Sequence, residues 1–234
     1  MNWRTDISSD YGLTARQADS LDYLSRLLAA ESGVNLTAAT EPADRVRVHL
    51  LDSLSLLNQP ELAGALSAVD IGSGAGFPGL PLAIAMPRTS FTLIEATAKK
   101  AAFIDRAISA LNLENARVLS IRAEEAGRSA LRESFDAGLA RAVGSMPEVL
   151  EYSLPLLRAG GHILLQRGRR QAGDRALAAG VAVQLGGRMK RISPVTPYPG
   201  ARNLHIWIFV KDHPTPDRFP RRPGIPRKRP LGPG

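Results

Sequence analysis

The sequence predicts an α/β fold built on a seven-stranded, mostly parallel sheet whose last strand is antiparallel, with a helical cap at the N-terminus. Two observations predict it. From Ser67 onward, short apolar runs alternate with segments of helical periodicity, which is the pattern of repeated right-handed βαβ units. A glycine-rich segment directly follows the first of these runs. With 234 residues and 44% apolar side chains, the chain is long enough to bury a core around such a sheet.

Two amphipathic helices are expected before the sheet, over residues 15–30 and 44–59. Thr14 and Gln17 fit a capping box at the start of the first. The second carries a polar stripe, which we expect to cover the ligand pocket or to face solvent. The stripe consists of Arg45, His49 and Ser53 at four-residue spacing, with Asp52 beside them.

Seven apolar runs are expected to form the strands. They are residues 67–72, 91–96, 116–121, 136–143, 161–166, 181–185 and 204–210. Helical patterns separate the earlier runs, notably over residues 97–112 and 146–158. Residues 186–203 are rich in Gly and Pro without helical period, so we expect a loop that joins the last two strands as an antiparallel pair. Trp207 and Phe209 in the last run are expected in the core.

The domain boundaries expected from these patterns are a helical cap over residues 1–62, a main domain over 63–211 and a basic, Pro-rich tail over 212–234. Residues 211–234 hold seven Lys or Arg and two Asp, out of a net charge of +8 for the whole chain. Because seven prolines also fall there, we expect an extended strap that forms neither strand nor helix. It either follows a phosphate backbone, packs back on the sheet through Phe219, or stays solvated.

Composition excludes several classes of protein. There are no cysteines, so disulfides, thiolate metal sites and cysteine nucleophiles are excluded. The longest apolar stretch, residues 77–87, is far shorter than a membrane span, and the N-terminus lacks an apolar leader. We therefore expect a cytoplasmic location, with no membrane and no bound metal.

The glycine-rich segment runs from Asp70 to Gly79, between the first strand and a helix, where open α/β sheets bind ligands. Its spacing fits G-x-G-x-x-G, and Glu95 lies 19 residues beyond Gly76, so a nicotinamide dinucleotide is one interpretation. Pro78 removes a backbone donor that a pyrophosphate would use, whereas the carboxylate of Asp70 suits a cation such as the amino group of S-adenosylmethionine. This favours S-adenosylmethionine, with Gly74 among the glycines that let it approach the backbone.

The order D-x-G-x-G-x-G, an acid at the end of the second strand and a seven-stranded sheet with its last strand reversed resemble the Rossmann-like class I methyltransferases. Shorter segments are similar to the ribosomal small-subunit methyltransferase G family, also called glucose-inhibited division protein B. These segments are NLT from Asn35, HLLDS from His49, DIGSGAGFPGLP from Asp70, RAEE from Arg122, RA from Arg141 and PRRPGIP from Pro220.

The resemblance implies S-adenosylmethionine-dependent N7-methylation of one guanine in 16S rRNA, in free RNA or in the small ribosomal subunit. By matching motif, it implies cofactor contacts at Gly72, Phe77, Ala123, Glu124 and Arg141. Two alternatives stay open at this point: an NAD-dependent oxidoreductase, and an RNA-binding module that has lost catalysis.

The residues give their own reasons for these sites. Glu95 ends the second strand, where its oxygens could accept both ribose hydroxyls, although it could also pair with Lys99 or Lys100 at the surface. Glu124 follows the third strand and either meets the adenine edge or starts a helix. Arg141 interrupts an apolar strand, so we expect it to face the cleft as a positioning residue, with a structural ion pair as the alternative.

The expected chemistry agrees with N7. Methylation at a pyrimidine C5 typically uses a cysteine adduct, and the fourth strand ends in Arg141-Ala142-Val143-Gly144 rather than the Asn/Asp-Pro-Pro-aromatic loop expected for exocyclic amines. Guanine N7 has a free lone pair and loses no proton, so no general base is expected.

Overall fold

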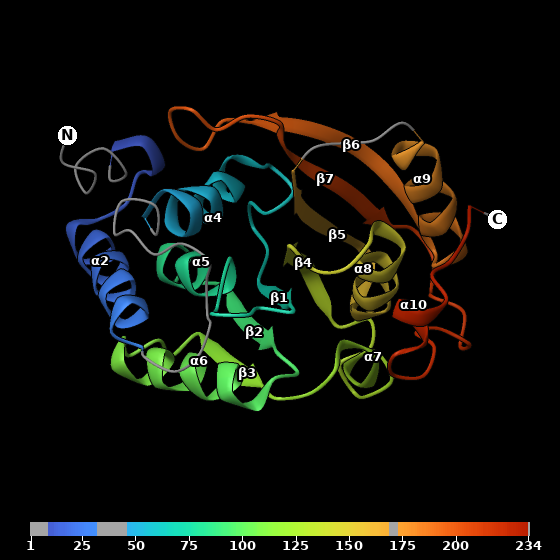
Figure 1. The fold of residues 1–234 in the computed structure, drawn as a ribbon, viewed down its shortest axis with the longest axis horizontal. Helices are drawn as coiled ribbons and strands as arrows, with labels where there is room; N and C mark the ends of the chain where they lie inside the picture. Colours follow the sequence, from blue (N-terminus) through green and yellow to red (C-terminus); the bar gives the residue numbers. More distant parts are fainter. Residues whose placement is uncertain (1–8, 32–45, 169–172, 234) are drawn as a thin grey trace.

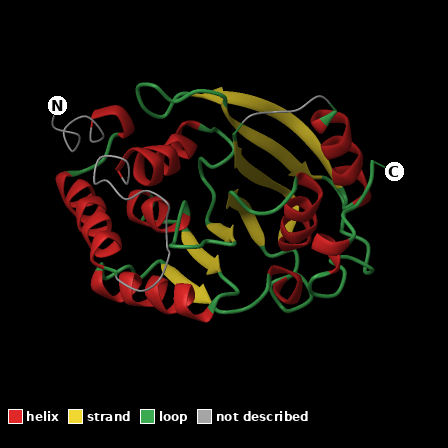
Figure 2. Cartoon of the chain, viewed as in Figure 1, coloured by secondary structure: helices red, strands yellow, loops and turns green. Residues whose placement is uncertain are grey.

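The computed structural model describes residues 9–31, 46–168 and 173–233, and these form a three-layered α/β arrangement around one twisted sheet (Figures 1 and 2). The sheet has seven strands in the order β3-β2-β1-β4-β5-β7-β6. The pairs among β1 to β5 are parallel, and β7 runs antiparallel to both of its neighbours. The predicted fold class is therefore confirmed, including the reversed last strand.

The strands are β1 (Ser67–Ile71), β2 (Ser90–Ile94), β3 (Ala116–Leu119), β4 (Phe135–Arg141), β5 (Leu157–Arg167), β6 (Gly187–Val195) and β7 (Leu204–Lys211). The α-helices are α2 (Ala15–Ala30), α4 (Asp52–Leu54), α5 (Gly79–Ala85), α6 (Ala98–Ala110), α7 (Ala123–Ala126), α8 (Met146–Ser153), α9 (Asp174–Gln184) and α10 (Ile225–Lys228). A π-helical turn, Val46–Leu51, precedes α4, and 3₁₀ turns cover Ser55–Asn58 and Leu154–Leu156.

The first predicted helix is confirmed at both ends. In α2 the Thr14 side chain accepts from the backbone of Gln17, whose side chain accepts in return from the backbone N–H of Thr14. The amide of Gln17 also donates to the carbonyl of Ile84 at the end of α5. The second predicted helix exists from Val46 onward as the π-helical, α and 3₁₀ turns in succession. Residues 44 and 45, which begin the predicted helix and include Arg45 of the polar stripe, lie outside the described residues. The NLT segment from Asn35 lies outside them as well.

Two apolar clusters fill the space on the two faces of the sheet, because successive strand residues point to opposite faces. One holds Ala68, Leu93 and Leu139 of the strands with the apolar faces of α2, α5 and α6. The other holds Val69, Ile94 and Leu165 with α8 and α9. Trp207 and Phe209 are buried in the second cluster, as predicted.

The sixth strand was predicted in the wrong place. Residues 181–185 lie at the end of α9 rather than in a strand. Four buried residues recur at helical spacing, and Val183 between them is exposed. The four are Ala178, Val181, Ala182 and Leu185. The short stretch 181–185 cannot reveal this spacing on its own. The strand is β6, inside the segment expected to be a loop, and it lies at the sheet edge with basic, partly exposed side chains.

The C-terminal segment also differs from the expected strap. Residues 225–228 form the single helical turn α10, with Gly224 before it and Pro226 in its first turn, where proline is tolerated. The segment packs on the second face of the sheet: Phe219 is buried there, and its carbonyl accepts from Arg132. The prediction that Pro-rich basic sequence excludes a helix is wrong over this turn.

None of the helices in the described ranges is long and apolar enough to cross a membrane.

Candidate active site

The glycine loop after β1 turns sharply at three positions where the backbone has positive φ. Gly72, Gly74 and Gly76 have φ of 67°, 60° and 88°, which side-chain-bearing residues rarely adopt. Gly72 also lies against the segment that follows β4, since a Cβ built on it would come within 2.8 Å of Val143. Its N–H donates to the carbonyl of Ile94 at 2.9 Å, which holds the loop over the end of β2.

Asp70 in β1 anchors this loop through a hydrogen bond. Its side chain is fully buried, and Oδ2 accepts from the backbone N–H of Gly79 at 2.9 Å, while Oδ1 has no partner among the described residues. Burial raises the pKa of this carboxyl group to about 7. Asp70 does not line either of the two pockets at this edge of the sheet. Its contact with a cofactor amino group therefore stays a prediction.

Glu95 ends β2 and holds the loop from the side. Its Oε2 accepts from the N–H of Gly74 at 2.9 Å, and its Oε1 accepts from the N–H of Thr97 at 2.8 Å. The side chain is buried, so Glu95 is not the exposed surface acid of the alternative interpretation. Each carboxylate oxygen keeps a second lone pair that a ligand hydroxyl can use.

A pocket of about 130 Å³ lies at the carboxyl ends of β1 and β2 beside α7. It brings together four of the predicted site residues, namely Gly72, Glu95, Ala123 and Glu124. Apolar side chains line it as well, together with that of Arg122. The apolar ones are Ile71, Ile94, Ile121 and Val143. The pocket thus combines an apolar lining with two carboxylates and one guanidinium group.

Tyr152 of α8 also lines this first pocket, and the sequence did not single it out. Burial and the nearby Glu124 raise its pKa to about 12, so its hydroxyl is protonated and can donate. Glu124 is buried, and its Oε1 accepts from the N–H of Gly224 in the C-terminal segment at 2.8 Å. The C-terminal segment thus reaches a predicted cofactor residue.

Arg141 ends β4 and meets the turn and helix that precede β1. Its Nη1 lies 3.3 Å from Oδ2 of Asp52, and its Nη2 lies 2.9 Å from Nδ1 of His49. Its guanidinium carbon is 5.6 Å from the ring centre of Phe77, and the His49 ring is 5.0 Å from the same ring. Phe77 is buried in this contact, and its predicted cofactor role stays a prediction.

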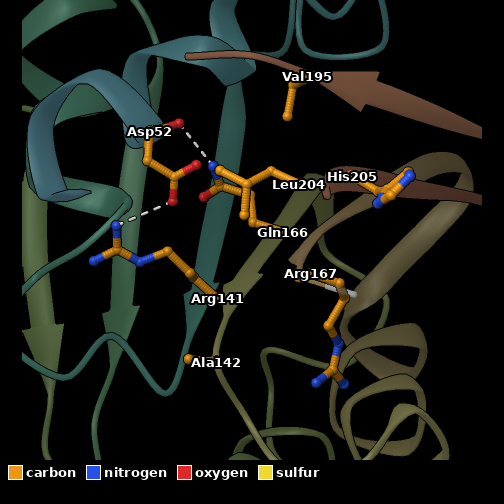
Figure 3. A pocket seen from close by; sticks show the side chains of 9 residues that line it. Asp52, Arg141, Ala142, Gln166, Arg167, Val195, Leu204 and His205 are labelled. Atoms are coloured by element: carbon orange, nitrogen blue, oxygen red, sulfur yellow. Dashed lines mark hydrogen bonds and ion pairs between the residues drawn. The ribbon is translucent and has the colours of Figure 1, made fainter. Parts of the chain in front are cut away.

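A second pocket, of about 200 Å³, opens beside Arg141 (Figure 3). Asp52 and Gln166 line it together with Arg141, and the amide of Gln166 donates to the backbone carbonyl of Asp52 at 2.7 Å. Burial raises the pKa of Asp52 despite the neighbouring guanidinium. Arg141 is therefore both ion-paired and at a pocket wall. Its role in positioning a reactant stays a prediction.

Sequence reasoning missed Gln166, although a signal was present. Gln166 ends the apolar run of β5 in the same way that Glu95 ends that of β2. A polar residue at the carboxyl end of a buried parallel strand is a candidate ligand contact. No group of three or more metal-binding side chains occurs within the described residues.

Known proteins resemble this chain over most of its length. The family described as rRNA small subunit methyltransferase G matches residues 16–192. A ribosomal RNA small subunit methyltransferase G of Chloroflexus aggregans is 45% identical over 210 residues, which cover 89% of this chain and 87% of that protein. The protein of the same name from Moorella thermoacetica is 39% identical over 228 residues, covering 96% and 95%.

Solved structures show the same fold at low sequence identity. TrmN from Thermus thermophilus has a TM-score of 0.52 and 20% identity, over 68% of this chain and 48% of that one. The mitomycin 7-O-methyltransferase MmcR has a TM-score of 0.55 and 15% identity, over 89% and 72%. Family model and relatives are methyltransferases, which leaves the NAD-dependent alternative without support. The chain belongs to the rRNA small subunit methyltransferase G family.

Proposed function

We propose that this protein transfers the methyl group of S-adenosylmethionine to N7 of a guanine in small-subunit ribosomal RNA. The observation that carries the proposal is the pair of pockets on either side of the end of β4. One holds Glu95 and Glu124, and the other holds Arg141 and Asp52. Donor and acceptor of a group transfer need two such adjoining sites.

The residues of the first pocket fit the adenosine part of the cofactor. The side chains of Ile94, Ile121 and Val143 offer apolar walls for a flat ring. Glu95 offers carboxylate oxygens for ribose hydroxyls, and the turn at Gly72 and Gly74 keeps side chains out of the cofactor's way. The buried and unpartnered Oδ1 of Asp70 suits a nearby cation, such as the amino group of the cofactor.

When bound, S-adenosylmethionine supplies an electrophilic methyl group on a positively charged sulfur. Glu95 and the turn at Gly72 and Gly74 would hold this cofactor, which would supply the methyl group to N7 and leave as the neutral thioether, with the positive charge passing to the guanine ring. N7 attacks with its own lone pair, so this chain does not need to remove a proton. Its residues act by orienting the two reactants, with Arg141 held in place by His49 and Asp52.

The substrate we propose is 16S rRNA, alone or in the small ribosomal subunit, in the cytoplasm. Basic side chains along the exposed part of the C-terminal segment, Arg222, Arg227, Lys228 and Arg229, support an RNA partner.

The function is tested by incubating the protein with tritium-labelled S-adenosylmethionine and small subunits that lack this methylation. We expect label in 16S rRNA and, after borohydride and aniline treatment, cleavage at one guanine. Labelled RNA that resists cleavage would place the methyl group on another atom. Cofactor binding without any labelled RNA would instead identify an RNA-binding module that has lost catalysis.

A further inference from the structure

The polar side chains that line the second pocket include two with acceptor oxygens, Asp52 and Gln166, besides Arg141, Arg167 and His205 (Figure 3). Gln166 is 5% exposed, and its Oε1 has no hydrogen-bond partner among the described residues, although its amide nitrogen is used. Such a buried, unsatisfied acceptor is costly unless a ligand supplies a donor. The amide nitrogen of Gln166 donates to the backbone carbonyl of Asp52, and the carboxylate of Asp52 is drawn beside Gln166 in Figure 3.

The ion pair of Asp52 with Arg141 leaves acceptor capacity on this carboxylate. At 3.3 Å the contact is longer than the 2.7–2.9 Å typical of a charge-assisted hydrogen bond. A carboxylate has about four lone-pair positions for donors. Its side chain is 14% exposed, so few water molecules reach it.

Apolar side chains also line the pocket. They are Val195 at the end of β6 and Leu204 at the start of β7, next to His205. A volume of about 200 Å³ is below the range of ~300–1,000 Å³ typical of sites for drug-sized ligands. The pocket therefore suits one flat ring system, with its faces on aliphatic side chains and one edge on Asp52 and Gln166.

The second pocket also lies where an acceptor for the methyl group must lie. Ala142 lines it, while the next residue, Val143, lines the first pocket together with Gly72. Two consecutive residues after β4 thus line neighbouring pockets. The second pocket adjoins the first, as the donor and acceptor sites of a direct methyl transfer must.

We propose that the second pocket holds the target guanine, whose N1–H and exocyclic amine donate to the carboxylate of Asp52 and to Oε1 of Gln166. This inference rests on the proposed function. It makes Asp52 and Gln166 the residues that select guanine. A guanine extruded from its helix presents this edge, whereas adenine presents an acceptor at N1 that these oxygens would repel.

The same contact favours the transition state. Methylation at N7 places positive charge on the ring, which makes N1–H and the amine stronger donors. A hydrogen bond from N1–H to the Asp52 carboxylate therefore strengthens as the methyl group is transferred, and that difference raises the rate.

The test compares guanine with inosine, which lacks the exocyclic amine. The methylated position is first mapped by the cleavage assay, and small subunits are then assembled on 16S rRNA with guanine or inosine at that position. We expect the wild-type protein to prefer guanine in kcat/KM by at least about tenfold. In Gln166→Leu the preference should fall to less than about threefold, mainly through loss of activity on guanine. Asp52→Ala removes the acceptor for N1–H, which both bases carry, so kcat/KM should fall on guanine and on inosine alike.

The dissociation constant of S-adenosylmethionine should stay within about twofold in both variants, and Asp105→Asn, on the exposed face of α6, provides a matched carboxylate control. Thermal melting checks that each variant is folded. A wild-type preference that persists in folded Gln166→Leu overturns the inference, as does an unchanged kcat/KM in folded Asp52→Ala or a wild-type protein that methylates inosine and guanine equally. If wild-type protein fails to methylate guanine subunits at all, the proposed function itself is wrong.

Discussion

Nη2 of Arg141 lies 2.9 Å from Nδ1 of His49, a residue 92 positions earlier in the chain. Nη1 of the same guanidinium pairs with Asp52. The Arg141 side chain is only 16% exposed. Its two contacts tie the end of β4 to the π-helical turn and to α4, which precede the sheet. The guanidinium is thus held by two side chains at the wall of the second pocket.

Arg141→Ala should reduce methyl transfer by at least about 100-fold, because it removes an oriented charged group from the reaction site. The free energy of unfolding should fall by about 1–3 kcal/mol, since Asp52 and His49 lose a partner. Activity and thermal melting are measured on the same preparations. Arg141→Lys keeps the charge without the planar fork and should restore stability better than activity. A lysine variant that restores both would assign Arg141 a purely structural role.

Glu95→Gln and Glu95→Ala separate the two tasks of this side chain. Both variants should weaken binding of S-adenosylmethionine by about 1–3 kcal/mol, the cost of losing charge-assisted hydrogen bonds. The glutamine can still accept from the N–H of Gly74 or Thr97, so it should lose less thermal stability than the alanine. Calorimetric titration measures the affinity. Equal affinity for wild type and both variants would show that another group holds the ribose.

Asp70 makes stability depend on pH in a defined direction. Its pKa is about 7 in the folded protein and near its ordinary value of 3.8 in the unfolded chain. Between about pH 4 and pH 7 the folded state therefore binds more protons, and this carboxyl group lowers stability as the pH rises. Asp70→Asn keeps an oxygen that can accept from the Gly79 N–H and removes the buried charge.

The melting temperature of Asp70→Asn relative to wild type should thus rise from pH 5 to pH 8, by on the order of 5 °C. Differential scanning calorimetry at both pH values measures this difference, in which contributions from other groups cancel. A difference that shrinks toward pH 8 would contradict the raised pKa.

Arg221 anchors the C-terminal segment. Its side chain meets the fully buried carboxylate of Glu151 at 2.6 Å, and its backbone N–H donates to the same group at 2.8 Å. Arg221→Ala should destabilise the fold by about 3–5 kcal/mol because it leaves a buried carboxylate without its cation. The added change Glu151→Gln should recover part of this loss. Denaturant unfolding of both variants measures it, and an unchanged midpoint for Arg221→Ala would show that the segment does not clamp the fold.

The exposed basic residues of α10 and its end allow a separate test of RNA binding. Replacing Arg227, Lys228 and Arg229 with alanine should leave the melting temperature within a few degrees of wild type, since all three are exposed. It should flatten the slope of log affinity for 16S rRNA against log salt by about 2–3 units if each contacts a phosphate. Filter binding at several salt concentrations measures the slope, and an unchanged slope would assign this segment to the fold alone.

Much of the fold was predictable because its causes are local. The capping box of Thr14 and Gln17 starts α2 where expected, since both groups lie within one turn. The glycine loop was predictable because glycine adopts the positive φ found at Gly72, Gly74 and Gly76 far more readily than other residues. The position of β6 was not, because the mostly apolar residues 181–185 fit a buried strand and the end of a helix equally well.

The sequence by itself determined the layered α/β fold, the glycine loop, and the polar residues placed at strand ends, such as Glu95 and Arg141, because periodicity and backbone preference act between near neighbours. The tertiary structure decided which of these side chains meet. Arg141 joins His49, and Gln166 joins Asp52 across 114 residues. Likewise Glu151 stays buried because Arg221, 70 residues later, returns to it. Such pairs form because a buried charge or polar group needs a partner, and chain packing alone determines which partner comes within reach.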